Sequence, residues 1–207
     1  MSEGPRIAVL DYGIGNLRSA EKALQHVGAA ARLVSDVESV EAADAVVLPG
    51  VGAFGACARA LRESGLEAPA RAAIDAGVPF FGVCVGFQLL YEGSAESPGA
   101  EGLGRFAGSV GPLPSGVKHP QMQWNRLEVR AGDAPEALCG LGERPWVYFV
   151  HSFAPPVGDE TVAVCDYGGP VAALAARGNL WGAQFHPEKS GTTGLALLAN
   201  FVALAAT

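Results

Sequence analysis

The stretch Val78-Pro79-Phe80-Phe81-Gly82-Val83-Cys84-Val85-Gly86-Phe87-Gln88 decides how the first half of the chain is expected to fold. An apolar run ends on a cysteine between two glycines, and a helical pattern follows. This order is typical of a nucleophile elbow, a sharp strand-to-helix turn that exposes a reactive side chain and leaves the next N–H, that of Val85, free to stabilise an oxyanion. Cys84 is therefore a candidate nucleophile. The alternative, a buried structural cysteine, does not explain why Gly82 and Gly86 bracket it so closely.

A base and a carboxylate follow later in the chain, in the motif Gln184-Phe185-His186-Pro187-Glu188. Pro187 favours extended backbone at His186, and residues two apart on an extended chain point to the same side. Glu188 can then hold the imidazole in the tautomer that accepts the thiol proton. A lone histidine on a strand is more often structural, but with Cys84 and Glu188 this one is predicted to complete a Cys-His-Glu triad.

Apolar strands alternate with helical patterns through the first half of the chain. Such alternation predicts a parallel sheet that helices cover on both faces. In open sheets of this kind, reactive groups gather at the carboxyl ends of the strands, where Cys84 is expected. The expected strands are 7–10, 32–34, 45–48 and 79–83, and the expected helices are 16–27, 56–63 and 69–76.

The second half has strand patterns separated by glycine-containing turns, which indicate antiparallel hairpins added to the parallel core. A closing helix over 193–205 is expected to pack on the core. The sequence thus predicts an α/β three-layer sandwich with a mostly parallel central sheet, and we expect residues 1–207 to form a single domain. The strands expected here are 126–129, 146–150, 161–164, 171–175 and 180–185.

Composition narrows the classes of function. The 207-residue chain is 49% hydrophobic and 17% charged, which is typical of a globular protein with a large core. Its formal net charge is −7 and its basic residues are scattered, unlike the clustered Lys and Arg of nucleic-acid or membrane surfaces. Residues 1–6 lack the apolar core of a signal peptide. We therefore expect a cytoplasmic protein that binds neither nucleic acid nor membrane.

The remaining cysteines, Cys57, Cys139 and Cys165, are predicted to be small buried hydrophobic residues. They lie in unrelated contexts without C-x-x-C spacing, so neither a zinc site nor a disulfide framework is indicated. No metal and no cofactor are expected.

The loop Gly50-Val51-Gly52-Ala53-Phe54-Gly55 matches the G-x-G-x-x-G pattern of dinucleotide sites. The match is weak, because the acidic residue expected about twenty positions later at a strand end is missing and the loop follows a later strand rather than the first. The favoured interpretation is a loop whose small residues let backbone N–H groups form the second half of an oxyanion hole. His151, which ends an apolar strand, is a second candidate base, although no acidic residue lies near it in sequence.

With these motifs the chain resembles the class I glutamine amidotransferases, and among them the glutaminase subunits of imidazole glycerol phosphate synthase. The resemblance runs nearly end to end, through residues 11–16, 49–54, 82–86, 148–153 and 184–190. The Cys motif in 82–86 and the His-Pro-Glu motif in 184–190 indicate the superfamily. The segments 11–16, 49–54 and 148–153 indicate the narrower group.

The resemblance implies hydrolysis of L-glutamine through a thioester on Cys84, with His186 moving the proton and Glu188 orienting it. It implies that the N–H groups of Val85 and of the loop at Val51 and Gly52 stabilise the oxyanion. It also implies a glutamine pocket that includes Gly52, Gln88, His151, Ser152 and Phe153.

The resemblance further implies a heterodimer with a (β/α)₈-barrel cyclase. In the family the glutaminase passes ammonia to this cyclase, which makes imidazole glycerol phosphate and aminoimidazole carboxamide ribonucleotide for histidine biosynthesis. The partner interface that it implies comprises Asn16, Gln121, Gln123, Trp124, Asn125 and Lys189.

One segment departs from the family pattern. The family usually has Pro-His-Met-Gly-Trp-Asn at the partner face, where this chain has Pro120-Gln121-Met122-Gln123-Trp124-Asn125. Replacing glycine by glutamine adds bulk and removes access to positive φ, so a glutaminase that serves a different synthase is a second hypothesis. A third, a non-catalytic nucleotide-binding module, rests only on the loop 50–55.

Overall fold

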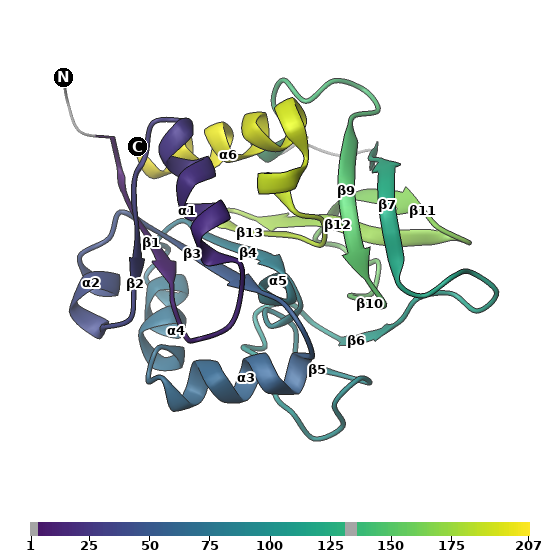
Figure 1. The fold of residues 1–207 in the computed structure, drawn as a ribbon, viewed down its shortest axis with the longest axis horizontal. Helices are drawn as coiled ribbons and strands as arrows, with labels where there is room; N and C mark the ends of the chain where they lie inside the picture. The colour runs from purple at the N-terminus through teal and green to yellow at the C-terminus, as the bar shows by residue number, and fades with distance from the viewer. Residues whose placement is uncertain (1–3, 131–135) are drawn as a thin grey trace.

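The computed structural model describes residues 4–130 and 136–207, and within these ranges the chain forms an eight-stranded sheet with helices on both faces (Figure 1). The strand order is β2-β1-β3-β4-β13-β12-β11-β8, in which β2, β1, β3, β4 and β13 are mutually parallel. The strands of this sheet are β1 (Arg6–Leu10), β2 (Ala30–Val34), β3 (Ala45–Gly50), β4 (Phe80–Cys84), β8 (Glu128–Val129), β11 (Thr161–Asp166), β12 (Pro170–Arg177) and β13 (Leu180–Ala183).

The helices complete the α/β sandwich expected from the strand and helix alternation. Figure 1 shows α1 and α6 on one face of the sheet and α3 and α4 on the other. Every residue of β3, β4 and β13 is buried, as expected for parallel strands covered on both faces. The helices are α1 (Leu17–His26), α2 (Val37–Glu41), α3 (Phe54–Glu63), α4 (Glu67–Asp75), α5 (Val85–Gln88) and α6 (Gly191–Ala205), with 3₁₀ turns η1 (Glu136–Leu138) and η2 (Pro187–Lys189).

Antiparallel strands extend the parallel core, which confirms the expected hairpins. β11 pairs with β12 and β12 pairs with β13, through the turns at 167–169 and 178–179. β13 pairs antiparallel with β12 but parallel with β4, so it joins the two halves of the sheet. This double pairing sets Ala183 beside Val83 and so brings the chain after β13 next to the elbow.

The single strand predicted over 126–129 is wrong. Arg126 ends β7, and the buried Leu127 separates it from β8. The reason is that β7 pairs with β9 whereas β8 pairs with β11, so the chain changes sheets at this point. β7 (Gln121–Arg126) and β9 (Trp146–His151) form a two-stranded ribbon, and β10 (Phe153–Ala154), β6 (Ser109–Pro112) and β5 (Gly93–Ser94) form a small third sheet.

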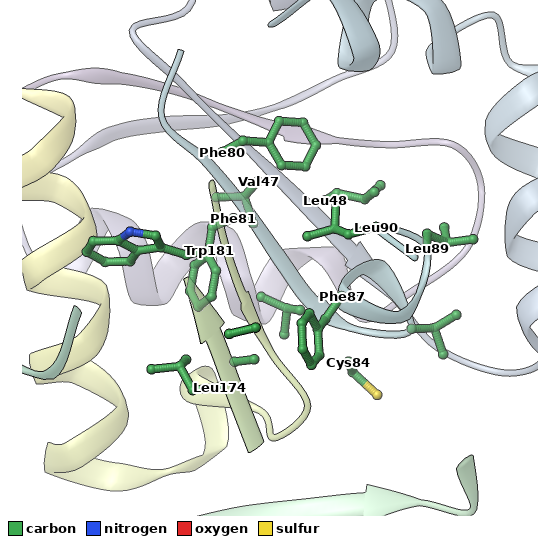
Figure 2. Packing of buried hydrophobic residues seen from close by; sticks show 14 of the residues in the cluster. Val47, Leu48, Phe80, Phe81, Cys84, Phe87, Leu89, Leu90, Leu174 and Trp181 are labelled. Atoms are coloured by element: carbon green, nitrogen blue, oxygen red, sulfur yellow. The ribbon is translucent and has the colours of Figure 1, made fainter. Parts of the chain in front are cut away.

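Close backbone packing fixes the elbow against the centre of the sheet. Figure 2 shows Phe87 of α5 among the buried side chains of β4 and β13, with the sulfur of Cys84 pointing away from the apolar cluster. A Cβ added to Gly86 would overlap the carbonyl of Leu48, and one added to Gly82 would lie 2.7 Å from the carbonyl oxygen of Gly86. The glycines that bracket Cys84 are therefore required by the approach of α5 to β3 and β4.

Among the helices of residues 4–130 and 136–207, none combines the length and the apolar character needed to span a membrane.

We predict that Gly86→Ala destabilises the fold. The new methyl group meets backbone that cannot move without shifting β3, and overpacking of this kind typically costs about 1–3 kcal/mol. Urea unfolding measures the loss. Gly111→Ala in β6 is the matched control, because nothing lies within 4 Å of its added Cβ. Equal stability of the two variants would contradict the packing argument.

Candidate active site

Cys84 is the last residue of β4 and has φ of 56° and ψ of −114°. Among the described residues, no other non-glycine residue has a positive φ. A side chain in this region of backbone space is strained by about 1–3 kcal/mol, and such strain is typical of functional positions. The sharp turn from β4 into the four-residue α5 is the geometry of a nucleophile elbow.

His186 and Glu188 form a buried pair beside Cys84. The Nδ1 atom of His186 lies 2.9 Å from Oε1 of Glu188, and their side chains are 5% and 7% exposed. Burial by itself lowers the pKa of His186, but hydrogen bonds with Cys84 and Glu188, and their charges, outweigh it and raise that pKa to about 9. This arrangement favours the imidazolium form of His186.

The pairing and the extended backbone at His186 were predicted, but the extended chain expected beyond His186 was wrong. His186 is extended, whereas Pro187–Lys189 forms the 3₁₀ turn η2 rather than an extended chain. Proline fits the first position of a helical turn because its missing N–H is not needed there. Ser190 then anchors the turn: its hydroxyl donates to the carbonyl of His186 at 2.7 Å and accepts from the N–H of Tyr148 at 3.0 Å.

A cavity of about 310 Å³ opens in front of the sulfur. Every residue that was expected in the substrate pocket and in the oxyanion hole lines this cavity. It is also lined by residues that sequence reasoning did not assign to it. The lining residues are Val51, Gly52, Cys84, Val85, Gln88, Glu96, Pro120, Val150, His151, Ser152, Phe153, His186 and Lys189.

Two buried side chains hold the carbonyl groups of the loop after β3. Tyr12 donates its hydroxyl to the carbonyl of Pro49 at 2.6 Å, and the thiol of Cys57 donates to the carbonyl of Val51 at 3.2 Å. Burial raises the pKa of both donors, so each keeps its proton. Because C=O and N–H of a trans peptide point in opposite directions, the N–H of Gly52 points away from Cys57. Gly52 has φ of 88°, which favours glycine there.

His151 is positioned as a neutral hydrogen-bonding group. Its Nδ1 lies 2.9 Å from the carbonyl oxygen of Phe153, which can only accept, so Nδ1 carries the proton and Nε2 has a free lone pair. The pKa of His151 falls to about 4, because burial and the nearby charge of His186 lower it by more than the bond to Phe153 raises it. His151 is therefore a poorer base than His186. Within the described residues, its Nε2 has no hydrogen-bond partner.

Sequence reasoning missed Glu96 and Gln184. Glu96 lies in the loop after β5, where it accepts from the N–H of Phe54 at 2.7 Å and lines the cavity; no local pattern marks it. Gln184 is fully buried, and its Nε2 lies 3.9 Å from the sulfur of Cys84. Its place two residues before His186, directly after a buried strand, was the available signal.

The residues expected at a partner interface are only partly accessible. Gln123, Trp124 and Lys189 are exposed, and so is Asn16, which lines a narrow space with His186 and Glu188. Asn125 is half-buried and donates to the carbonyl of Asp166 at 2.9 Å.

The assignment of Gln121 to an accessible interface is wrong, because its side chain is fully buried. It is the first residue of β7, where the ribbon still packs on the main sheet, and its Nε2 lies 3.7 Å from the sulfur of Cys165. Cys57 and Cys165 are buried as predicted, but Cys139 is exposed.

Within the described ranges, no cluster of three or more His, Cys, Asp and Glu side chains is arranged to hold a metal ion.

Comparison with known proteins assigns the family. The sequence model of the family "Glutamine amidotransferase class-I" matches residues 8–205. The chain is a class-I glutamine amidotransferase. This amidotransferase is 50% identical to the imidazole glycerol phosphate synthase subunit HisH of Deinococcus radiodurans, over 95% of this chain and 93% of the relative. It is 44% identical to the HisH subunit of Caldanaerobacter subterraneus, over 94% and 96%.

Solved structures agree with the fold of this amidotransferase. A crystal structure of a glutamine amidotransferase superposes with a TM-score of 0.76 at 25% identity, over 97% of this chain and 99% of the other. The structure of PurLQS from Thermotoga maritima contains a chain that superposes with a TM-score of 0.74 at 21% identity, over 97% and 98%. The three-layer α/β arrangement is thus shared with these proteins.

The strain at Cys84 predicts a difference between two substitutions that both remove the thiol. Cys84→Gly relieves the positive φ, whereas Cys84→Ala keeps it. After allowance for the greater freedom of glycine in the unfolded chain, we expect Cys84→Gly to be about 1 kcal/mol more stable than Cys84→Ala. Thermal and urea unfolding of the two proteins measure this difference. An alanine variant as stable as the glycine variant would show that the elbow is not strained.

Proposed function

We propose that this chain hydrolyses L-glutamine to glutamate and ammonia, and supplies the ammonia to the cyclase subunit of imidazole glycerol phosphate synthase in histidine biosynthesis. The observation that carries the proposal is the elbow cysteine facing a buried His186–Glu188 pair at one cavity, in a chain of the HisH family. We propose that residues 1–207 act as one glutaminase domain in the cytoplasm.

The residues have complementary roles in this reaction. His186 takes the proton of Cys84, and the thiolate attacks the amide carbon of glutamine. The C–S bond forms while the C=O electron pair moves to oxygen, and the N–H groups of Val85 and of the loop at Val51 and Gly52 stabilise that charge. Collapse of the intermediate breaks the C–N bond, and His186 protonates the departing nitrogen to give ammonia. Glu188 orients the ring and stabilises its charged form.

Hydrolysis of the thioester completes the cycle. Water attacks the thioester carbon and gives a proton to His186, the oxyanion forms again, and its collapse breaks the C–S bond. The sulfur recovers its electron pair and the proton returns to it, while glutamate leaves. Both tetrahedral intermediates need the same backbone donors, and removal of one such donor typically costs about 2.7–4 kcal/mol in the barrier.

Glu96 is proposed to bind the α-ammonium group of glutamine. Among the described residues that line the cavity, Glu96 alone carries a carboxylate. Its bond to the N–H of Phe54 holds this carboxylate at the cavity wall. Gln88 lines the same cavity, and only 3% of its surface is exposed. A substrate that carries both an ammonium and an amide group suits this pair.

The β7–β9 ribbon is the proposed docking face for the cyclase. Met122, Trp124 and Trp146 are 62%, 48% and 48% exposed, and the guanidinium of Arg126 lies 4.8 Å from the ring centroid of Trp146. Large exposed apolar groups of this kind mark interaction surfaces. The other end of the ribbon reaches the cavity at His151, so a partner bound here lies close to the site of ammonia release.

Glutamate release tests the proposal directly. The purified chain is assayed with glutamine, alone and together with the cyclase encoded in the same genome and its ribonucleotide substrate. We expect stimulation by the complete mixture, and a loss of at least about a thousandfold in Cys84→Ala with its folding and cyclase binding retained. No glutamate from the complete mixture, with Cys84 still alkylated by a glutamine analogue, would reject this synthase in favour of another acceptor.

The proposed role of Glu96 predicts a defect in substrate affinity. Glu96→Gln keeps an oxygen that can accept from Phe54 but removes the charge, so we expect KM for glutamine to rise about tenfold or more while kcat changes little. Steady-state kinetics measure both constants. Glu92→Gln, at an exposed position in the same segment, serves as the control. An unchanged KM in Glu96→Gln would contradict the assignment.

A further inference from the structure

A chain of buried amide groups ends at the sulfur of Cys84. The Nε2 of Gln88 donates to the carbonyl of Phe153 at 2.9 Å and to Oε1 of Gln184 at 3.0 Å. The Nε2 of Gln184 in turn lies 3.9 Å from the sulfur, within the range of a hydrogen bond to sulfur. Gln184 is fully buried and Gln88 is 3% exposed, so water does not compete freely for these bonds.

The direction of this chain is fixed by the acceptor at its far end. The carbonyl of Phe153 can only accept, so the NH₂ group of Gln88 must face it. The same NH₂ group faces the Gln184 amide, which therefore presents its oxygen to Gln88 and its own NH₂ group to Cys84. A flipped Gln184 would set two NH₂ groups against each other and an oxygen against the sulfur.

Strand pairing explains why this side chain reaches the nucleophile. β13 runs parallel to β4 with Ala183 beside Val83, so the next residues, Gln184 and Cys84, lie side by side at the carboxyl end of the sheet. The N–H of Gln184 donates to the carbonyl of Ala173 at 2.9 Å, which holds its backbone to β12.

We propose that Gln184 is a further catalytic residue of the glutaminase reaction, whose amide N–H donates to the sulfur of Cys84 and stabilises the thiolate. This inference rests on the proposed function of the site. Charge builds on the sulfur when His186 takes its proton, and again when the C–S bond of the thioester breaks. A fixed N–H dipole in a buried site stabilises that charge without reorganisation. Because Gln88 lines the substrate cavity, these hydrogen-bonded amides connect the cavity wall to the nucleophile.

Alkylation of Cys84 tests this role without requiring glutamine turnover. The rate of reaction with iodoacetamide is measured against pH. The peptide that carries Cys84 is quantified by mass spectrometry, because the exposed Cys139 can react as well. In Gln184→Met, which keeps length but removes the donor, we expect the rate near neutral pH to fall about three- to tenfold. The midpoint of the pH profile should move to higher pH, and kcat for glutamine should fall by more than KM rises.

Gln121→Met is the matched control. Gln121 is also fully buried, and its amide lies beside the sulfur of a different cysteine, Cys165. We expect the profile of Cys84 to be unchanged in this variant. If Gln184→Met leaves the profile of Cys84 unchanged while glutamine hydrolysis falls, Gln184 supports only Gln88 and the proposal is overturned. If the wild-type chain is alkylated normally but never hydrolyses glutamine, the proposed function fails separately.

A second measurement covers the case in which Gln184→Met does not fold. In the wild-type chain, the side-chain amide proton resonances of Gln184 should titrate together with Cys84, and in Cys84→Ala this titration should disappear. Amide resonances that do not respond to pH in the wild-type chain, or that respond equally in both proteins, would overturn the proposal.

Discussion

The approach of the backbone of α5 to strands β3 and β4 is the constraint on which the rest of the site depends. Gly86 lies against the carbonyl of Leu48, and Gly82 lies against Gly86, so the chain can turn sharply enough to place Cys84 at a positive φ. Phe87 then enters the apolar core and anchors the short helix (Figure 2). The buried core holds the elbow in a conformation that Cys84 does not favour by itself, and the sulfur faces the cavity.

Buried polar groups around the sulfur are stable because nearly all of them have partners. Glu188 pairs with His186, Ser190 ties His186 to Tyr148, and the amides of Gln88 and Gln184 satisfy each other. A buried polar group without a partner typically costs about 1–3 kcal/mol, so each such bond also fixes an orientation. The result is a preorganised site in which the atoms that gain or lose charge already face donors or acceptors.

The β7–β9 ribbon connects this site to the molecular surface. Gln121 at one end of β7 is fully buried, whereas Trp124 further along is half-exposed. The ribbon therefore has a packed end at the cavity and an open end with aromatic side chains. Gln123, where the family resemblance led us to expect glycine, lies on the open part, and Gln121, where it led us to expect histidine, lies in the interior beside Cys165. The two departures from the family pattern thus have different physical settings.

The sequence by itself determined the features whose cause is local. Glycine spacing around Cys84, the apolar runs of the parallel strands and the His-Pro-Glu motif each specify backbone over a few residues, and they predicted the elbow, the sheet and the partners of the triad. The turn at Pro187 shows the limit of such local prediction. Both a 3₁₀ turn and an extended chain place the side chains of His186 and Glu188 side by side, so the motif did not distinguish between them. Only the tertiary structure decided which further residues join the triad around the sulfur and the cavity. The contact of Gln184 with Cys84 follows from the parallel pairing of β13 with β4, and Glu96 reaches the cavity because its loop packs on the start of α3. Periodicity in a sequence determines which face of a strand is buried. Which other strand pairs with that strand depends on the packing of the whole sheet.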